Sequence, residues 1–138
     1  MIPKKILYCT DFSENSRAAG NYAVEYAKAF EADLMVLYVI ESWEGFPTFQ
    51  DRLKADIVRL IRSSEKLANA ELKEWADQVI QGVERVSTQA RMGIPAREIV
   101  LLANEQAFDL IVMGTRGRTG FKHVLLGSVA ENVIIAFL

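Results

Sequence analysis

One segment of the sequence combines glycines and cationic side chains without any acidic residue. It reads Gly114-Thr-Arg-Gly-Arg-Thr-Gly-Phe-Lys-His-Val-Leu-Leu-Gly-Ser128 and holds Arg116, Arg118 and Lys122, whereas the whole chain has a net charge of −2. Glycine lacks a Cβ atom and adopts positive φ readily, so its backbone N–H groups can approach an anion closely. The segment therefore predicts a binding site for an oxyanion, and phosphate is the natural candidate.

The end of this segment can be interpreted in two ways. Gly127, Ser128 and Val129 resemble the start of a helix, where unpaired N–H groups and the helix dipole favour a phosphate. Ser128 and Glu131 also have the spacing of a capping box, which would simply begin that helix. Arg116 is ambiguous as well, because it could donate charge-assisted hydrogen bonds to a phosphate or stay solvated on an exposed loop. The residues alone leave the role of Ser128 open and favour the solvated role for Arg116.

The glycine-rich segment must be positioned by the rest of the fold. Along the chain, short apolar runs typical of strands alternate with apolar patterns typical of helices. Strands are expected over residues 5–10, 34–40, 83–92 and 109–113, the third of them at an edge of the sheet. Helices are expected over residues 14–30, 53–79, 95–107 and 130–137. This alternation predicts a single α/β domain over residues 1–138, with a parallel sheet and helices on both of its faces.

Ligands of such sheets bind beyond the carboxyl ends of the strands, where the strand order reverses. That rule points to the segments after the first, second and fourth expected strands. Asp11 follows the first strand, but an Asp just before Ser13 can equally cap the helix or compensate its dipole. From the residues alone, capping is the favoured role of Asp11.

The composition excludes several classes of protein. Cys9 is the only cysteine, so the chain can form neither an internal disulfide nor a Cys-rich zinc site, and its place in an apolar strand predicts an inert core thiol. The isoelectric point of about 5.5 and the lack of a basic stripe argue against a protein that binds nucleic acid. The longest apolar run has seven residues, against about 20 for a membrane span. We expect a cytoplasmic protein with no membrane segment, no metal site formed by side chains and no catalytic residue.

The spacing Gly114-x2-Gly117-x9-Gly127-Ser128 is more specific than a glycine-rich loop in general. It fits neither the P-loop nor the dinucleotide fingerprint. It resembles the G-x2-G-x9-G-[S/T] motif of the ATP-binding branch of the universal stress protein family, and the similarity extends over residues 5–13, 36–40, 93–99 and 113–134. The resemblance implies a doubly wound, Rossmann-like sheet of the adenine nucleotide alpha hydrolase type, with ATP across the carboxyl ends of its strands.

The resemblance also implies a role for each matching residue. Asp11 would contact the ribose or the adenine, Thr10 would lie beside the base, and the backbone of Val39 would recognise the adenine edge. Met113 would back the ribose. The residues expected around the phosphates are Gly114, Arg116, Gly117, Gly127, Ser128 and the amide of Val129.

The C-terminal end of the chain departs from the family pattern. Relatives usually have a fifth strand that often mediates dimerisation, whereas a helix is expected here, with the usual fifth strand missing or altered. The fourth strand would then lie at an open edge of the sheet. Ile134, Ile135, Phe137 and Leu138 nevertheless place apolar surface near the terminus, so we expect a homodimer.

These observations favour an ATP-binding universal stress protein that acts as a nucleotide-dependent regulatory switch in the stress response, with Mg2+ or Mn2+ accompanying ATP. Two alternatives remain at this point. One is a slow ATPase or nucleotidyl transferase, and the other is a dimerising scaffold that needs no nucleotide. Because no water-activating residue is evident, ATP hydrolysis is expected to be weak at most.

Overall fold

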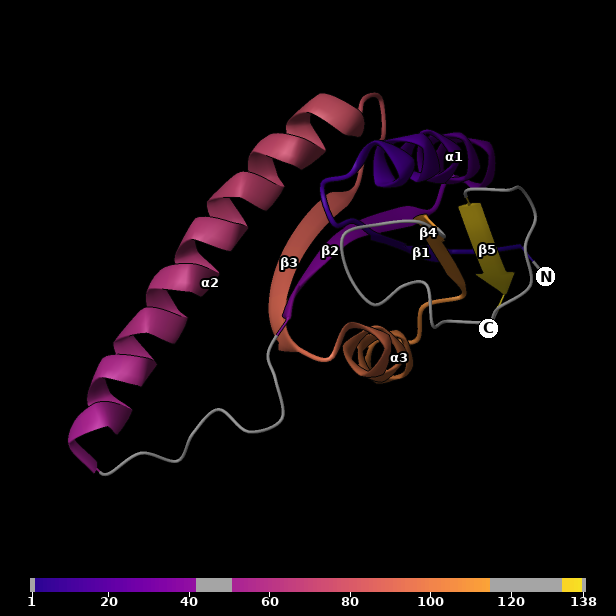
Figure 1. The fold of residues 1–138 in the computed structure, drawn as a ribbon. Coiled ribbons are helices and arrows are strands. Elements are labelled where there is room, and N and C mark those ends of the chain that lie inside the picture. The colour runs from indigo at the N-terminus through magenta and orange to yellow at the C-terminus, as the bar shows by residue number, and fades with distance from the viewer. Residues whose placement is uncertain (1, 42–50, 115–132, 138) are drawn as a thin grey trace.

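The computed structural model describes residues 2–41, 51–114 and 133–137. In chain order, its elements are β1 (Lys5–Cys9), α1 (Glu14–Phe30), β2 (Asp33–Glu41), α2 (Asp51–Val79), β3 (Val86–Gly93), α3 (Pro95–Glu105), β4 (Leu110–Gly114) and β5 (Val133–Phe137). The strands form one sheet in the order β3-β2-β1-β4-β5 (Figure 1). The first four strands are parallel, and β5 runs antiparallel to β4. The expected α/β fold and the edge position of β3 are confirmed.

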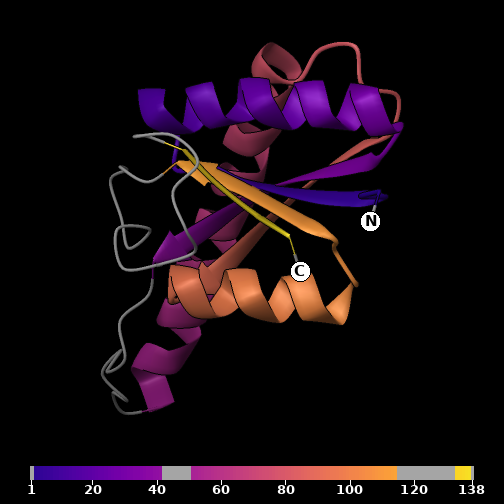
Figure 2. The same ribbon diagram turned by 90° about the vertical axis from the view of Figure 1, so that its right-hand side faces the viewer.

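Helices cover both faces of this sheet. Figure 2 shows α1 on one face and α3 on the other. The C-terminal half of α2 packs on the same face as α1, through Leu72, Trp75, Ala76 and Val79, while Leu102 of α3 belongs to the core on the opposite face. Because both faces are buried, β1, β2 and β4 can be apolar without alternation, as parallel strands usually are.

The long helix α2 extends beyond the sheet. Its N-terminal half projects past β3 in Figure 1, and Leu60 and Leu67 are 66% and 71% exposed. None of the helices within the described ranges combines the length and the apolar composition that a membrane crossing requires.

The helix expected over residues 130–137 is wrong for its last part, because Val133–Phe137 forms β5. Three of the five residues in this segment are β-branched, and such side chains favour strands. A short apolar run cannot be assigned to helix or strand by its periodicity alone. By pairing with β4, this strand covers backbone groups that would otherwise lie at an open edge.

Two titratable side chains of β1 lie in the core. Cys9 is 1% exposed, and burial raises the pKa of its thiol, which confirms the expected inert core residue. Tyr8 is fully buried, and desolvation raises the pKa of its phenol, although hydrogen bonds with Trp75, Thr10 and Ser16 act in the opposite direction. Both groups are therefore held in their neutral, protonated form.

The helices α1 and α2 approach each other closely at Gly20. A Cβ atom at this position would lie 2.6 Å from Cγ1 of Val79 and 2.8 Å from the hydroxyl oxygen of Tyr8. Neither neighbour can move easily, since both belong to the core. Small residues are thus required on this face of α1, which buries Ala19, Gly20 and Ala23.

We predict that Gly20→Ala lowers the free energy of unfolding by about 1–3 kcal/mol, because the new methyl group overlaps Val79 and Tyr8. Helix propensity alone would predict a gain of up to about 1 kcal/mol, so the sign separates the two effects. Urea denaturation measures the change. Asn21→Ala, on the exposed side of the same turn, is the control and should stay within about 0.5 kcal/mol of the parent. A more stable Gly20→Ala variant would contradict the prediction.

The buried Cys9 and Tyr8 also predict how stability depends on pH. In the unfolded chain these groups lose their protons near their ordinary pKa values of 9.0 and 10.0, whereas the folded protein retains the protons to higher pH. The contribution of these two groups to the free energy of unfolding is therefore complete below pH 9. Above pH 9 the free energy of unfolding falls, by at most about 1.4 kcal/mol per pH unit for each group. Urea denaturation of the parent and of Cys9→Ala at several pH values from 7 to about 10.5 tests this, and equal slopes above pH 9 would contradict it.

Candidate functional site

The carboxyl ends of β1 and β4 form the point at which the strand order reverses. Cys9 at the end of β1 pairs with Leu37 of β2 on one side and with Met113 of β4 on the other. From this end, the chain of β1 leads towards α1, whereas β4 leads into residues 115–132. The general rule for parallel sheets places a ligand at this edge.

The turn between β1 and α1 is held by its own polar side chains. The amide of Thr10 continues the sheet by donating to the carbonyl of Leu37 at 2.9 Å. The amide of Phe12 donates to Oγ1 of Thr10 and the amide of Ser13 donates to Oδ1 of Asp11, both at 3.0 Å. Thr10 is fully buried and Asp11 is 3% exposed, so two polar side chains are buried at this edge of the sheet.

These contacts test one of the roles that the sequence left open for Asp11, the capping of α1. The N-cap of α1 is Ser13, as expected, because its side chain accepts a hydrogen bond from the amide of Ser16 at 3.2 Å. Asp11 instead accepts from the amide two residues ahead, which is the geometry of an Asx turn. Capping the helix is therefore not the task of Asp11, and the expectation that favoured capping is wrong.

The helix α1 begins directly against the end of β4. A Cβ atom at Gly114 would lie 3.1 Å from the carbonyl carbon of Asn15 and 3.3 Å from the amide nitrogen of Ser16. Ser16 is linked to the neighbouring strand as well, since its Oγ lies 2.9 Å from Oγ1 of Thr10 and its carbonyl accepts from the hydroxyl of Tyr8. The close approach of β4 to the first turn of α1 favours a glycine at position 114.

The structure thus brings together several of the residues expected at the site. Thr10, Asp11, Met113 and Gly114 are buried at adjoining strand ends, and Val39 lies two residues beyond the β2 residue that pairs with Cys9. The other expected residues lie outside the described ranges. They are Arg116, Gly117, Gly127, Ser128 and Val129.

An aromatic group behind the turn was not anticipated from the sequence. The ring of Phe12 lies 4.6 Å from that of Tyr38 in β2 and 5.4 Å from that of Trp75 in α2, measured between centroids. The indole Nε1 of Trp75 donates to the hydroxyl of Tyr8 at 3.3 Å, and the guanidinium of Arg17 lies 4.6 Å from the Trp75 ring centroid. The helical spacing of Trp75 indicated only a buried face, because contacts between residues so distant in sequence have no local signal.

One hollow elsewhere has a cationic lining, but its cations are already engaged. Lys5 and Arg85 border a hollow at the amino ends of the strands. The ammonium of Lys5 donates to the carbonyl of Gln106, and Arg85 pairs with Asp33. Among the described residues, no group of three or more His, Cys, Asp or Glu side chains could hold a metal ion.

Sequence comparison connects the chain to a known family. The family model described as "Universal stress protein family" matches residues 3–135. The chain is 37% identical to Universal stress protein MJ0531 of Methanocaldococcus jannaschii, covering 95% of this chain and 75% of the relative. It is 34% identical to Universal stress protein MJ0577 of the same organism, covering 95% of this chain and 88% of the relative.

Solved structures give the same result. The structure of MJ0577 superposes with a TM-score of 0.73 at 28% identity, over 92% of this chain and 85% of that one. Universal stress protein UspA from Lactobacillus plantarum has a TM-score of 0.69 at 25% identity, over 93% and 88% of the two chains. A universal stress protein in complex with cAMP has a TM-score of 0.55 at 26% identity, over 94% and 84%.

Proposed function

Because the chain belongs to the universal stress protein family, we propose that it binds an adenine nucleotide at the carboxyl ends of β1, β2 and β4. The observation that carries this proposal is the buried turn of Thr10 and Asp11, which lies where the strand order reverses and close to the start of the glycine-rich segment at Gly114. A structurally similar universal stress protein in complex with cAMP supports the same class of ligand.

In this proposal the nucleotide is ATP, and the site has a nucleoside end and a phosphate end. Asp11 serves the ribose or the adenine, Thr10 lies beside the base, the backbone of Val39 recognises the adenine edge and Met113 backs the ribose. The phosphate end consists of Gly114, Arg116, Gly117, Gly127, Ser128 and the amide of Val129. Because glycines and backbone amides form most of this end, binding depends on close approach of the main chain as well as on charge.

A divalent cation in this proposal is held mainly by the nucleotide. Mg2+ usually keeps several waters and binds through substrate phosphates with one or two carboxylates. Mg2+ or Mn2+ would neutralise phosphate charge there, next to the cationic segment.

The same residues favour a binding switch over a catalyst. Phosphoryl transfer needs an aligned nucleophile and usually a base or a group that positions water. The sequence from Gly114 to Ser128 contains no carboxylate, and Oδ1 of Asp11 already accepts the amide of Ser13. We therefore propose a regulatory protein of the stress response, in the reducing cytoplasm that suits its lone buried thiol, Cys9.

The nucleotide site predicts the behaviour of matched glycine variants. The parent should bind ATP with Mg2+ in a calorimetric titration, and Gly127→Val should weaken binding at least about tenfold while staying folded, because its side chain blocks the approach of phosphate. Gly120→Val is the control, since Gly120 lies in the same segment but outside the G-x2-G-x9-G pattern, and it should bind as the parent does. A parent that binds none of ATP, ADP and AMP would refute the proposal.

We also predict a homodimer. The strand β5 is the last in the sheet order, so its outer backbone groups have no strand partner within the described part of the chain. An open apolar strand edge favours pairing with a second copy. Light scattering should give twice the chain mass of 15.5 kDa. A monomer that persists at high protein concentration would contradict this prediction.

A further inference from the structure

The backbone of Phe12 is in an uncommon conformation. Its φ is 64°, in the left-handed region that bulky residues rarely adopt. Two other non-glycine residues within the described ranges have positive φ, Glu31 and Ala107, and both lie just after a helix, where this conformation is frequent. Phe12 instead lies before a helix, between Asp11 and the N-cap Ser13. Its conformation therefore has to be maintained by contacts beyond the helix itself.

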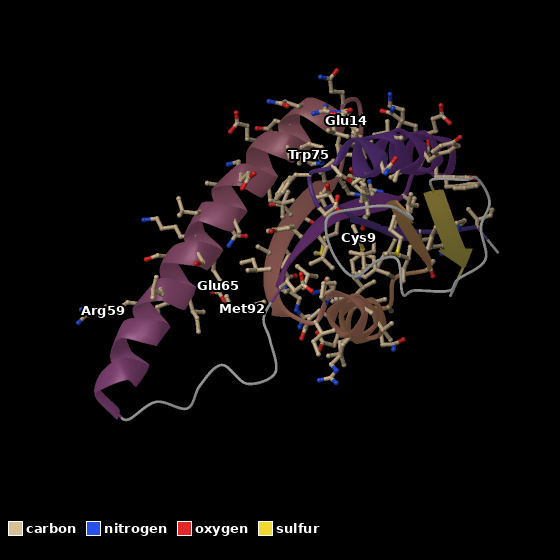
Figure 3. The ribbon with its side chains drawn as sticks, in the orientation of Figure 1. Cys9, Glu14, Arg59, Glu65, Trp75 and Met92 are labelled. Atoms are coloured by element: carbon tan, nitrogen blue, oxygen red, sulfur yellow. The ribbon has the colours of Figure 1, made fainter. Side chains whose placement is uncertain are left out.

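The side chain of Phe12 provides those contacts. Its ring meets Tyr38 at an interplanar angle of 46° and Trp75 at 77°, the second being an edge-to-face arrangement. Trp75 is only 9% exposed and is itself fixed by Tyr8 and Arg17. In Figure 3, Trp75 lies on the side of α2 that faces α1 and the sheet. The ring of Phe12 is thus held by side chains from two different elements.

The conformation of Phe12 determines the direction of two amides. The amide of Phe12 donates to Oγ1 of Thr10, and the amide of the next residue, Ser13, donates to Oδ1 of Asp11. If residue 12 left the left-handed region, the peptide that carries the Ser13 amide would turn, and the carboxylate of Asp11 would lose this donor. Phe12 thus affects the Asp11 carboxylate through its backbone conformation.

We propose that Phe12 is a positioning residue of the nucleotide site: its ring, held by Tyr38 and Trp75, maintains the left-handed backbone that orients the Asp11 carboxylate. This inference rests on the proposed function, because it assigns Asp11 to the nucleoside end of the site. The proposal also connects α2 to the site, since Trp75 of α2 contacts Phe12.

The comparison of Phe12→Ala with Phe12→Gly tests the proposal. Both substitutions remove the ring, but glycine adopts the left-handed conformation without steric cost, whereas alanine does not. Calorimetric titration with ATP and Mg2+ should therefore show binding about 5- to 30-fold weaker for Phe12→Ala and within about threefold of the parent for Phe12→Gly. A residue that acted through packing alone would give equal losses in both variants, or a larger loss with glycine.

A double-mutant cycle with Asp11→Ala tests whether Phe12 acts through Asp11. In the Asp11→Ala background, Phe12→Ala should produce no further loss of affinity. Circular dichroism monitors folding, and if Phe12→Ala does not fold, the polar pair Phe12→Asn and Phe12→Ser repeats the comparison, because Asn tolerates positive φ far better than Ser. Asn should then bind ATP more tightly than Ser.

Each outcome bears on the proposal. Rescue by glycine together with a non-additive cycle supports it. Equal losses for alanine and glycine, or full additivity with Asp11→Ala, would overturn it while leaving nucleotide binding intact. A parent protein that binds no nucleotide would overturn the proposed function and, with it, the proposed role of Phe12.

Discussion

The carboxyl end of β1 is constrained from two sides, and the candidate site depends on that constraint. Cys9 is paired in register with β2 and β4, and the amide of Thr10 extends the pairing by one more bond to Leu37. The chain must then leave the sheet and begin α1 within three residues, while Gly114 of β4 lies against the first turn of the helix. Within this short, buried turn, the backbone amides donate hydrogen bonds to the polar side chains of the turn itself. The buried positions of Thr10 and Asp11 follow from this local shortage of space.

The two helices on one face of the sheet, α1 and α2, pack against it in different ways. The helix α1 uses small residues around Gly20 to lie close to Tyr8 and Val79. The helix α2 packs on the core through larger residues of its last turns, Leu72, Trp75 and Val79, while its first half projects from the sheet with Leu60 exposed. Among the side chains of α2 that the structure describes, the buried ones all lie in its C-terminal half.

Much of this arrangement could be predicted from local patterns. Continuous apolar runs such as Leu34–Ile40 indicated parallel strands, Ser13 was a recognisable N-cap, and the glycine spacing led to the correct family. The roles of all the expected site residues stay predictions, and Arg116, Gly117, Gly127, Ser128 and Val129 also lie outside the described ranges. Ala130, Val133, Ile134 and Phe137 have the spacing of one side of a helix, but a short apolar run fits a strand equally well, and only pairing with β4 distinguishes the two. The conformation of Phe12 depends on Tyr38 and Trp75, which lie 26 and 63 residues away in the sequence, so no local pattern could reveal it.

The buried thiol of Cys9 makes the central strand accessible to measurement. A reagent that reacts with thiolates can modify this side chain only when the sheet opens, because the folded protein keeps the thiol desolvated and protonated. Its rate of modification in native buffer therefore reports the fraction of molecules in which β1 is exposed. Since the chain has no other cysteine, every modified molecule records the same event. A second cysteine introduced on the surface of α2 could be labelled selectively in the folded protein, while Cys9 stays unlabelled.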